Sequence, residues 1–547
     1  MPTKLSSGMW LVFAVLLAAP APAQSVQDPH LRFEVIATEP EWLTTMAFIG
    51  DEDILALEKD TGKVRRVLNR VLQPNPVLDV AVDSASERGL LGIATDPDFP
   101  HNRWVYLYYT ESPTTSEVFN DANSSNRVYR YTWNPSTATL TDPRRLLDLG
   151  VSAPQFPAVH NGGVIAFGPD DMLYVVVGDL GRSSQRPDLN SGGIMRVDRN
   201  GQAPRDNPFY NGANPADPIN RFISYGLRNS FGMAFDPVTG DVWESENGPE
   251  SYDEINHIVR GMNGGWSPIM GPDDRDPESL ADLWMAPGSV YRDPEFSWKV
   301  PVVPIGMTFV ESRILGCDNE HDLLVNDLGC INLYRFELDA ARDGLVLTSP
   351  ALADRVADND GDSCNTELSE VIFGEAWAVT DMDNAPDGSL YLLQLSFDPT
   401  IRRLSPIPGS FPDADNDLVA NACDCATADA SAFAPPREVP RIRPSGRSPL
   451  TLGWNPQRAT AGSGTAFSVA SGRLSDLRAS GFGAACRLGA DGTAPERIDN
   501  RADPASGDGY YYLVRAANSC GTASYGNGSG AVDPRDTLDA ALLPLCP

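Results

Sequence analysis

The segment GGVIAFGPDDMLYVVVGD, residues 162–179, places a turn of Gly, Pro and Asp between two apolar runs. Proline presets φ and aspartate accepts a tight return of the chain, whereas Val, Tyr, Leu and Ile are typical of strands. The segment therefore predicts two antiparallel β-strands joined by a short turn.

The same strand–turn–strand pattern recurs six times before residue 405, in segments that begin at Met46, Leu90, Gly162, Phe231, Ile305 and Ala378. Starts separated by about 45 to 75 residues fit four-stranded blades around an axis better than a solenoid with shorter coils. Helical periodicity is scarce. We expect an all-β chain whose residues 30–407 form a six-bladed β-propeller.

The composition changes after Pro406. The segment GSFPDADNDLVANACDC, residues 409–425, has aspartates at alternate positions, Asp413, Asp415 and Asp417. Alternating carboxylates in a loop suit calcium, and a solvated acidic linker is the alternative. The segment resembles a thrombospondin type 3 repeat, with Leu418 where such repeats have glycine. Residues 408–435 are therefore expected to be a calcium-binding-like linker.

Residues 436–547 contain short strands separated by Gly, Ser and Pro, such as TLGWNP, TAFSVASG and YYYLVRAANSCG. This pattern resembles a fibronectin type III-like β-sandwich. We expect a small accessory module at the end of the chain.

The N-terminus has the order of a secretory signal: Lys4, an apolar run over residues 9–19, and small residues up to Ala23. A membrane anchor would need roughly 20 apolar residues, and this run is shorter. No later segment has the pattern of a bilayer span. The prediction is a signal peptide over residues 1–23 and a secreted or periplasmic protein.

Charge and cysteine content restrict the partners and the compartment. The formal net charge is −32, which argues against nucleic acid and anionic lipid as partners, because both are bound by Lys and Arg. The acidity favours solubility, calcium binding or both. The even set of eight cysteines in an exported chain favours disulfides over thiolate metal sites. All eight follow residue 316, so the first half must be held together by its core.

Residues 225–266, YGLRNSFGMAFDPVTGDVWESENGPESYDEINHIVRGMNGGW, gather groups suited to an anion and to a hard cation. Arg228 offers a fixed fork of donors to carboxylate or quinone oxygens. The turn at Gly248 and Pro249 and the carboxylates of Asp253 and Glu254 offer the oxygen ligands that calcium prefers. The segment predicts a site that binds both an anion and a hard cation.

His160 begins the motif HNGG, at the start of the segment that ends in Asp179. A neutral imidazole can take a proton from a hydroxyl near pH 7 if a partner fixes its tautomer. Asp179 is the expected partner, because both residues lie at the same end of the predicted strand pair. A structural histidine and a turn-forming aspartate are the alternative.

Taken together, HNGG, ERGLLGIATDPDF from Glu87, GLRNSFG, ENGPESYDEIN and GGW resemble the soluble pyrroloquinoline quinone-dependent glucose and aldose sugar dehydrogenases. The resemblance covers about residues 33–406. It implies a six-bladed propeller that oxidises the C1 hydroxyl of a sugar, transfers hydride to a calcium-held quinone and passes electrons to an external acceptor.

The resemblance also implies roles for individual residues. His160 corresponds to the general base and Asp179 to the carboxylate that orients it. Arg228 corresponds to the residue that polarises the quinone oxygens, and Asn229 to a neighbouring cofactor contact.

The metal ligands implied by the resemblance follow in the next turn. The carbonyls of Gly248 and Pro249 correspond to ligands of the calcium that bridges to the cofactor. Asp253 and Glu254 match a second, structural calcium site.

The chain also departs from the glucose-oxidising members. Val159 stands where they have aspartate. Glu87, which we expect to bind the cofactor, stands where they have glutamine. Their three basic cofactor contacts align with Gly329, Ala378 and Thr380. Charge-assisted hydrogen bonds of this kind contribute about 1.5 to 3 kcal/mol each.

Two outcomes therefore stay open. Cofactor binding is weak, or other groups such as Arg182 replace the missing charges. The alternative function is a non-catalytic, calcium-stabilised propeller that binds carbohydrate or protein, as relatives resembling hedgehog-interacting protein do. The sequence predicts no oligomeric state.

Overall fold

A computed structural model describes most of the chain, namely residues 24–38, 41–151, 158–186, 190–277, 280–358, 364, 366–395, 399–446, 449–526 and 533–547. The predicted signal peptide, residues 1–23, lies outside the described residues. None of the described helices is both long and apolar enough to cross a bilayer.

All six strand–turn–strand segments form antiparallel pairs, as the sequence predicts. The pairs are β3 (Leu43–Gly50) with β4 (Asp53–Glu58), β8 (Leu90–Thr95) with β9 (Trp104–Glu111), β12 (Ile165–Phe167) with β13 (Leu173–Val177), β16 (Ser230–Phe235) with β17 (Val242–Glu246), β22 (Pro304–Phe309) with β23 (Leu323–Asp327), and β27 (Val379–Asn384) with β28 (Leu390–Gln394).

Further antiparallel strands extend each pair, and the third and fourth sheets also have parallel strands at one edge. In the same order the antiparallel strands are β5 (Lys63–Leu68) and β6 (Val71–Leu72), β10 (Ser125–Asn134) and β11 (Thr139–Gly150), β14 (Gly193–Val197) and β15 (Phe222–Tyr225), β18 (Asp253–Ile258) and β21 (Phe296–Trp298), β24 (Asn332–Phe336) and β26 (Ile372–Glu375), and β29 (Thr400–Pro406) and β2 (Leu31–Thr38).

Strands of successive sheets contact one another in a closed cycle. β8 lies against β3 and β12, β16 lies against β13 and β22, and β27 lies against β22 and β3. The cycle closes because β2, from the start of the chain, pairs with β29 of the last sheet. The core lies between sheets: Leu55 and Leu107, from consecutive sheets, share one buried cluster.

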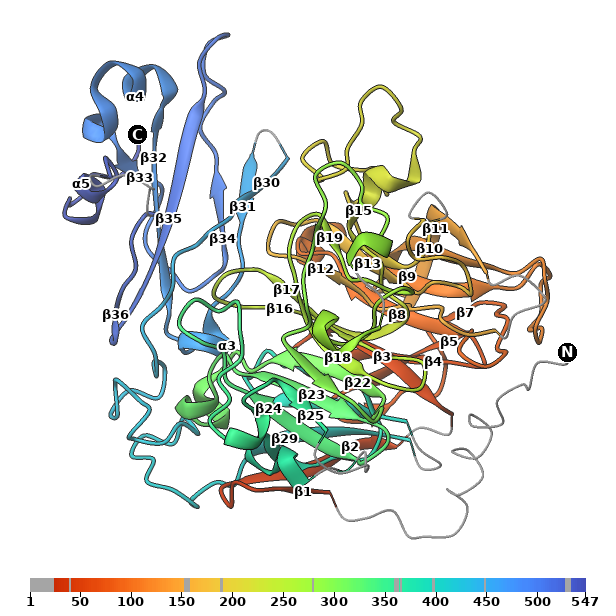
Figure 1. The fold of residues 1–547 in the computed structure, drawn as a ribbon. Helices are drawn as coiled ribbons and strands as arrows, with labels where there is room; N and C mark the ends of the chain where they lie inside the picture. Colours follow the sequence, from red (N-terminus) through yellow and green to blue (C-terminus); the bar gives the residue numbers. More distant parts are fainter. Residues whose placement is uncertain are drawn as a thin grey trace, which may run out of the picture.

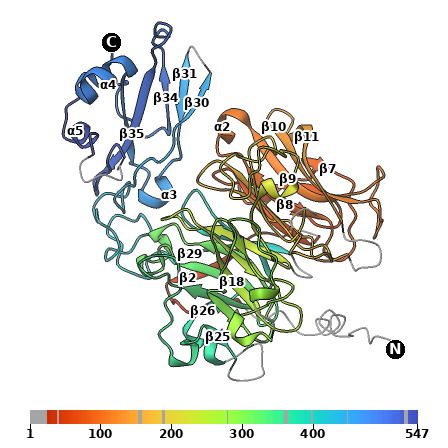
Figure 2. The same ribbon diagram turned by 45° about the horizontal axis from the view of Figure 1, so that its top comes forward.

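The C-terminal residues form two further sheets beside the cycle (Figures 1 and 2). One consists of β30 (Arg443–Gly446), β31 (Leu450–Gly453) and β34 (Glu496–Asp499). The other consists of β33 (Cys486–Arg487), β32 (Ala466–Arg473), β35 (Tyr510–Asn518) and β36 (Gly521–Thr522). Leu452, Trp454 and Phe467 belong to a core that both sheets share. We call the described residues between 436 and 547 the C-terminal module.

The cysteines form four disulfides, which confirms the prediction of bridges rather than thiolate metal sites: Cys317–Cys423, Cys330–Cys364, Cys425–Cys520 and Cys486–Cys546. The sheets before residue 317 have no bridge. Their stability rests on apolar packing, with side chains such as Leu55, Val105 and Tyr108 fully buried.

The C-terminal module contacts the turns that follow the first strands of the sheets. Its ion pairs with these turns include Arg458 with Asp51, Glu496 with His101, Arg443 with Asp171, and Arg437 with Glu320. Arg437 also donates to the carbonyl of Pro237. A cavity beside the last sheet is lined by Glu311 and Asn384 from the cycle and by Pro456 and Arg458 from the module.

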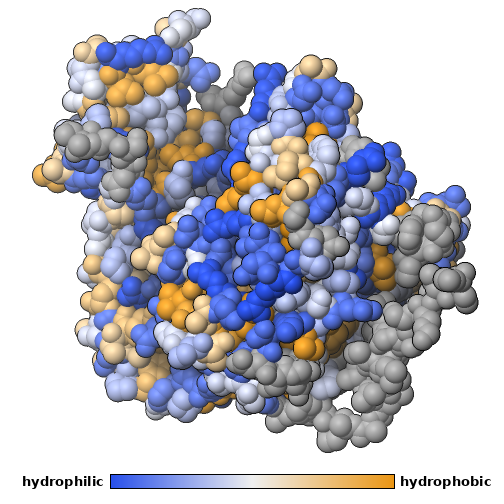
Figure 3. Space-filling model, in the orientation of Figure 1, coloured by the Kyte–Doolittle hydropathy of each residue, from blue (hydrophilic) through white to orange (hydrophobic). Residues whose placement is uncertain are grey.

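On the face of the molecule shown in Figure 3, polar residues predominate and apolar side chains form separate small groups. This surface agrees with the strongly acidic composition.

Candidate functional site

Most of the predicted site residues lie at the ends of neighbouring strands in the third and fourth sheets, and Glu87 precedes β8 of the second sheet. His160 precedes β12, and Asp179 follows β13. Arg228 and Asn229 immediately precede β16, and Gly248 follows β17. These positions are all at the end where the first strands begin, opposite the turns that the C-terminal module contacts.

His160 and Asp179 form a hydrogen-bonded pair. The Nδ1 atom of His160 lies 2.7 Å from Oδ1 of Asp179. The other oxygen of Asp179 accepts a hydrogen bond from the indole N–H of Trp266 at 2.8 Å. Asp179 is buried, and the His160 side chain is 15% exposed. This geometry fixes the imidazole tautomer with a proton on Nδ1, which leaves Nε2 as a proton acceptor.

The backbone around His160 leaves no room for a side chain at position 178. His160 has a positive φ of 58°, and a Cβ at Gly178 would lie 2.2 Å from the carbonyl oxygen of His160. Glycine at position 178 therefore lets the two segments approach, and this approach brings the histidine to the aspartate that follows.

Glu87 holds the histidine segment from the second sheet. Its Oε2 atom accepts hydrogen bonds from the backbone N–H of His160 at 2.6 Å and from Nδ2 of Asn229 at 3.1 Å. Oδ1 of Asn229 accepts from the backbone N–H of Gly162 at 3.3 Å. The hydrogen bonds of Glu87 and Asn229 thus connect three segments of the site.

Arg228 brings a cation into this largely buried region. Its Nη1 donates to the carbonyl of Asn247 at 2.7 Å, and its guanidinium lies 5.4 Å from the ring centre of Trp266. Its Nε is buried and has no hydrogen-bond partner among the described residues. Burial lowers the pKa of Arg228, and the nearby carboxylates of Asp179 and Glu246 oppose that shift.

Asp253 shapes the turn at Gly248 and Pro249. One of its oxygens accepts from the backbone N–H of Gly248 at 2.8 Å. The other accepts from the N–H groups of Val302 and Val303 at 2.7 and 2.6 Å. Burial raises the pKa of Asp253 to about 6, and these backbone hydrogen bonds oppose the rise. Three backbone N–H groups therefore donate to Asp253, whether or not an ion also binds there.

Three glutamates lie buried on one face of the fourth sheet. Glu246 on β17 is opposite Glu254 on β18, and Glu244 is opposite Asn256. The amide of Asn256 donates to Oε1 of Glu244 at 3.0 Å and to Oε2 of Glu254 at 2.9 Å. The second oxygens of Glu244 and Glu246 are buried without a partner among the described residues.

Burial is the largest cause that raises the pKa of each of these glutamates, to about 8 for Glu244 and about 7 for Glu254. The pKa of Glu246 is also raised, by burial and then by the charges of Glu254 and Glu244. Carboxylates in such surroundings are stabilised by a proton or by a cation.

Arg182 lies beside the pair of His160 and Asp179. Its backbone N–H donates to the carbonyl of Asp179 at 2.8 Å, and its Nη2 donates to the carbonyl of Val151 at 3.0 Å. At the positions aligned with the basic contacts, Ala378 is buried and Thr380 donates to the carbonyl of Leu43. Neither position supplies a charge.

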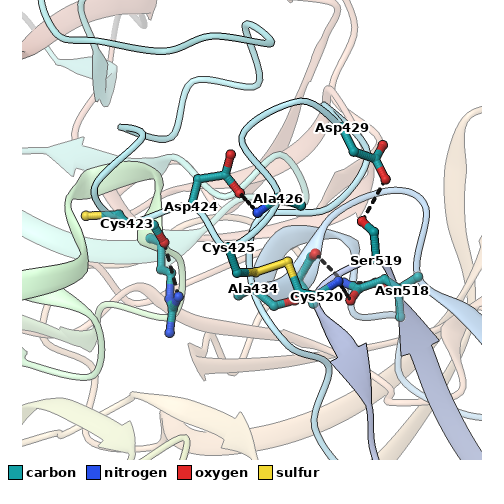
Figure 4. The surroundings of a disulfide bond; sticks show 12 residues. Cys423, Asp424, Cys425, Ala426, Asp429, Ala434, Asn518, Ser519 and Cys520 are labelled. Atoms are coloured by element: carbon teal, nitrogen blue, oxygen red, sulfur yellow. Dashed lines mark hydrogen bonds between the residues drawn. A yellow bond between two sulfur atoms is a disulfide. The ribbon is translucent and has the colours of Figure 1, made fainter.

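The predicted linker aspartates also come together, but elsewhere. Carboxylate oxygens of Asp413, Asp415 and Asp417 lie within 4.8 Å of one another. They lie after the last sheet, on the chain segment that leads to the C-terminal module, to which Cys425 of this segment is bonded through Cys520 (Figure 4).

Sequence reasoning assigned no role to Trp266, Glu244 or Glu246. The signal for Trp266 was its place at the end of the GGW motif. The two glutamates alternate in WESE, which also reads as the exposed face of a strand, so only the packing of the next sheet shows that they are buried.

A family model described as glucose/sorbosone dehydrogenase matches residues 39–402. The chain belongs to this family. The match includes strands of all six sheets, although β2 lies before it, and it includes every predicted site residue except the linker aspartates.

Three relatives illustrate the range of the glucose/sorbosone dehydrogenase family. The chain is 31% identical over 271 residues to quinoprotein glucose dehydrogenase B of Acinetobacter calcoaceticus, a match that covers 44% of this chain and 54% of that protein's length. It is 26% identical over 416 residues to the aldose sugar dehydrogenase YliI of Escherichia coli, covering 74% and 96%. It is 26% identical over 221 residues to human hedgehog-interacting protein, covering 35% and 30%.

Solved structures of the family share the fold. A glucose dehydrogenase described as a putative oxidoreductase from a Thermus species has a TM-score of 0.52 at 28% identity, covering 68% of this chain and 99% of the other. The pyrroloquinoline quinone-bound aldose sugar dehydrogenase of Streptomyces coelicolor has a TM-score of 0.51 at 24% identity, covering 70% and 99%. Together with the cyclic contacts, these likenesses show a β-propeller.

Proposed function

We propose that this family member is a pyrroloquinoline quinone-dependent dehydrogenase that oxidises the C1 hydroxyl of an aldose-type sugar and passes the electrons to an external acceptor. The observation that supports this most directly is the pair of His160 and Asp179, which lies on the same face as the partly unpaired Arg228. We further propose that a signal peptide directs the protein to the periplasm or the exterior.

In this proposal His160 accepts the hydroxyl proton of the sugar at Nε2. Asp179 holds the imidazole through Nδ1 and stabilises the imidazolium that forms when the proton arrives. Trp266 and the backbone N–H of Gly181, which donates to Asp179 at 2.7 Å, keep this carboxylate oriented. The hydrogen bond that Glu87 accepts from the backbone N–H of His160 fixes the position of the backbone that carries the imidazole.

The residues present fit a quinone and a hard cation. The buried Nε of Arg228 is an unused donor suited to a quinone oxygen. The carbonyls of Gly248 and Pro249 would hold one Ca²⁺, and Asp253 and Glu254, with the unpaired oxygen of Glu246, would hold a second, structural Ca²⁺. The quinone, when bound, supplies the acceptor for the hydride. Arg228, with Asn229 and Arg182 beside it, would stabilise the charge that develops there.

We also propose how the chain is divided. The six sheets of residues 30–407 would be the blades of a six-bladed propeller, residues 408–435 a linker, and residues 436–547 a fibronectin type III-like sandwich. The cyclic contacts of the first strands support the blades, and the core shared by two C-terminal sheets supports the sandwich.

A second candidate function is a binding module for carbohydrate or protein. The largest effects of charge on the pKa of Arg228 come from the carboxylates of Asp179, Glu246, Glu87 and Asp253. Ala378 and Thr380 add no positively charged side chain. Such surroundings favour a neutral or cationic ligand over an anionic one, and the relation to hedgehog-interacting protein is in keeping with this reading.

Calorimetric titration of pyrroloquinoline quinone into the mature protein, with and without Ca²⁺, separates the two candidates. We expect one-to-one binding that requires Ca²⁺. Turnover of aldoses with a dye acceptor should then follow. Heat signals that are absent in both conditions would contradict the dehydrogenase and leave the binding module.

The role of His160 has its own test. His160→Ala should reduce turnover by about 100-fold or more, because general base catalysis typically contributes that much, and should change the melting temperature little. His30→Ala, at an exposed histidine remote from the site, is the matched control. A large loss of stability with His160→Ala would support a structural histidine instead.

A further inference from the structure

A cavity outside the candidate site lies where the second sheet meets the edge of the first. Its volume is about 320 Å³, within the range of about 300 to 1,000 Å³ that sites for small molecules occupy. We call it the tyrosine cavity, because its lining includes Tyr109, Tyr129 and Tyr131. Val80, which follows β7 (Leu78–Asp79), closes it from the first sheet, and the exposed Thr114 and Pro143 lie where it opens to solvent.

Strand alternation explains why these side chains face one cavity. β9 and β10 are antiparallel, with Tyr109 directly opposite Arg127. Residues directly opposite each other share a face of a sheet, and so do residues two apart along a strand. Glu111 on β9, and Tyr129 and Tyr131 on β10, therefore lie on the same face as this pair.

The three tyrosine rings form an aromatic wall. The rings of Tyr109 and Tyr129 are stacked, with centres 5.3 Å apart and planes at 19°. The ring of Tyr131 lies 6.2 Å from that of Tyr129, at 40°. The face of an aromatic ring is partly negative, and it attracts the C–H groups that make one side of a sugar ring apolar. The wall therefore suits a ring-shaped ligand with an apolar side.

The hydroxyl groups of Tyr109 and Tyr131 are buried and only partly used. They lie 3.2 Å apart, and among the described residues each hydroxyl has only the other as a hydrogen-bond partner. The two residues are 3% and 4% exposed. One hydrogen bond uses one of the two hydroxyl hydrogens, so a donor is left at the cavity wall. Because an unpaired buried donor is costly, a polar group inside the cavity is expected to accept from it.

Glu111 adds an acceptor whose charge is already balanced. Its side chain is 27% exposed and forms an ion pair with Arg127. It also accepts from the hydroxyl of Tyr129 at 3.0 Å. Asp148 pairs with both Arg127 and Arg145, so the two acids and the two bases of this group balance. The cavity therefore offers hydrogen-bonding groups without a net charge, which suits the hydroxyls of a neutral ligand.

We propose that the tyrosine cavity binds one neutral pyranose ring. The apolar side of the sugar packs on the tyrosine rings, and one of its oxygens accepts the free hydroxyl hydrogen of the pair of Tyr109 and Tyr131. Its own hydroxyls donate to Glu111. This site is separate from the candidate site and does not depend on either function proposed there.

The test is titration of the full mature protein with the methyl glycosides of glucose, galactose, mannose and xylose, followed by hydrogen exchange of the backbone in β9 and β10. The methyl group blocks the C1 hydroxyl, so oxidation at C1 does not consume the probe. At least one glycoside should slow this exchange in the wild type. Unchanged exchange with all four glycosides would overturn the site.

Tyr129→Ala removes part of the aromatic wall and should weaken binding of the glycoside by about tenfold. Tyr210→Ala, at a partly exposed tyrosine between β14 and β15, is the matched control and should bind like the wild type. Glu111→Gln leaves the wall in place and keeps the size of the side chain. It should also weaken binding by about tenfold, because hydrogen bonds to a charged acceptor are the stronger ones. Wild-type affinity in either cavity variant would overturn the proposal.

His160→Ala separates this cavity from the candidate site. The glycoside should slow exchange in β9 and β10 of this variant as it does in the wild type. Loss of that effect would assign the sugar to the candidate site and overturn the proposal. The methyl glycoside of a disaccharide then identifies the source of the sugar: tighter binding than that of the monosaccharide indicates the end of a glycan chain, and equal affinity indicates a free monosaccharide.

Discussion

At the scale of single residues, the candidate site depends on braces that come from three sheets. Glu87 shows this best, because one oxygen holds both the backbone of His160 and the side chain of Asn229. A glutamine at this position could present its carbonyl oxygen to the same two donors. An alanine would leave both donors without a partner.

We therefore expect Glu87→Gln to fold with a stability close to that of the wild type, and Glu87→Ala to lose about 1 to 3 kcal/mol of unfolding free energy. Urea denaturation of the three proteins measures this. If Glu87→Gln loses as much as Glu87→Ala, the brace depends on the charge of Glu87 rather than on its hydrogen bonds.

Part of this residue-scale picture could be predicted from the sequence. The pairing of His160 with Asp179 follows from two strand ends joined by a short turn. The contact of Trp266 with Asp179 could not be predicted, because it joins residues that no local pattern connects.

At the scale of elements, the strands of the propeller bury acids that their sequence alternation would place in water. The turns and the strand pairs were predictable because proline, glycine and aspartate fix short-range geometry. The sequence did not predict which face of each strand is buried, because both faces of an inner sheet pack against neighbours. Asp327, at the end of β23, is another buried acid of this kind.

Asp327 gives a test by pH. It is fully buried, and burial raises its pKa to about 7. The native carboxyl therefore keeps a proton that the unfolded chain releases above about pH 4, so its contribution to stability falls as the pH rises from about 4 to 7. Asp327→Asn carries no such proton, and it should reduce the stability difference between pH 5 and pH 8 by about 2 kcal/mol.

Denaturant midpoints at the two pH values measure this difference. Asp343→Asn, at an exposed aspartate of the same sheet's connecting loop, should behave like the wild type. An unchanged pH dependence in Asp327→Asn would show that other groups cause it.

At the scale of the whole molecule, the C-terminal module covers the side of the propeller opposite the candidate site. The change of composition after Pro406 predicted a separate unit, but not where it docks, since its ion pairs involve single charged residues, mostly arginines, spread over a long sequence. Arg443 is the most buried of them, with its guanidinium 2.9 Å from Asp171 and 2.7 Å from Asn455.

Arg443→Ala should weaken docking by about 1 to 3 kcal/mol, because the largely buried Asp171 loses its hydrogen-bonded partner and keeps only Arg199 and Arg441, each at 3.9 Å. Small-angle scattering should then show a larger radius of gyration for the variant. Arg478→Ala, on the exposed helix α4 (Leu474–Ser480), is the control. A radius equal to that of the wild type would show that the disulfides and the remaining contacts suffice to hold the module.

The strand that closes the propeller has a mechanical consequence. Leu31 is paired with Pro406, so the two ends of the closed cycle leave it side by side. A force that separates these ends would break the hydrogen bonds of β2 and β29 one after another, like a zipper, rather than all together in shear. The bond between Cys317 and Cys423 changes the path of that force. Tension applied through the C-terminal module reaches the fifth sheet directly and bypasses the closing strand.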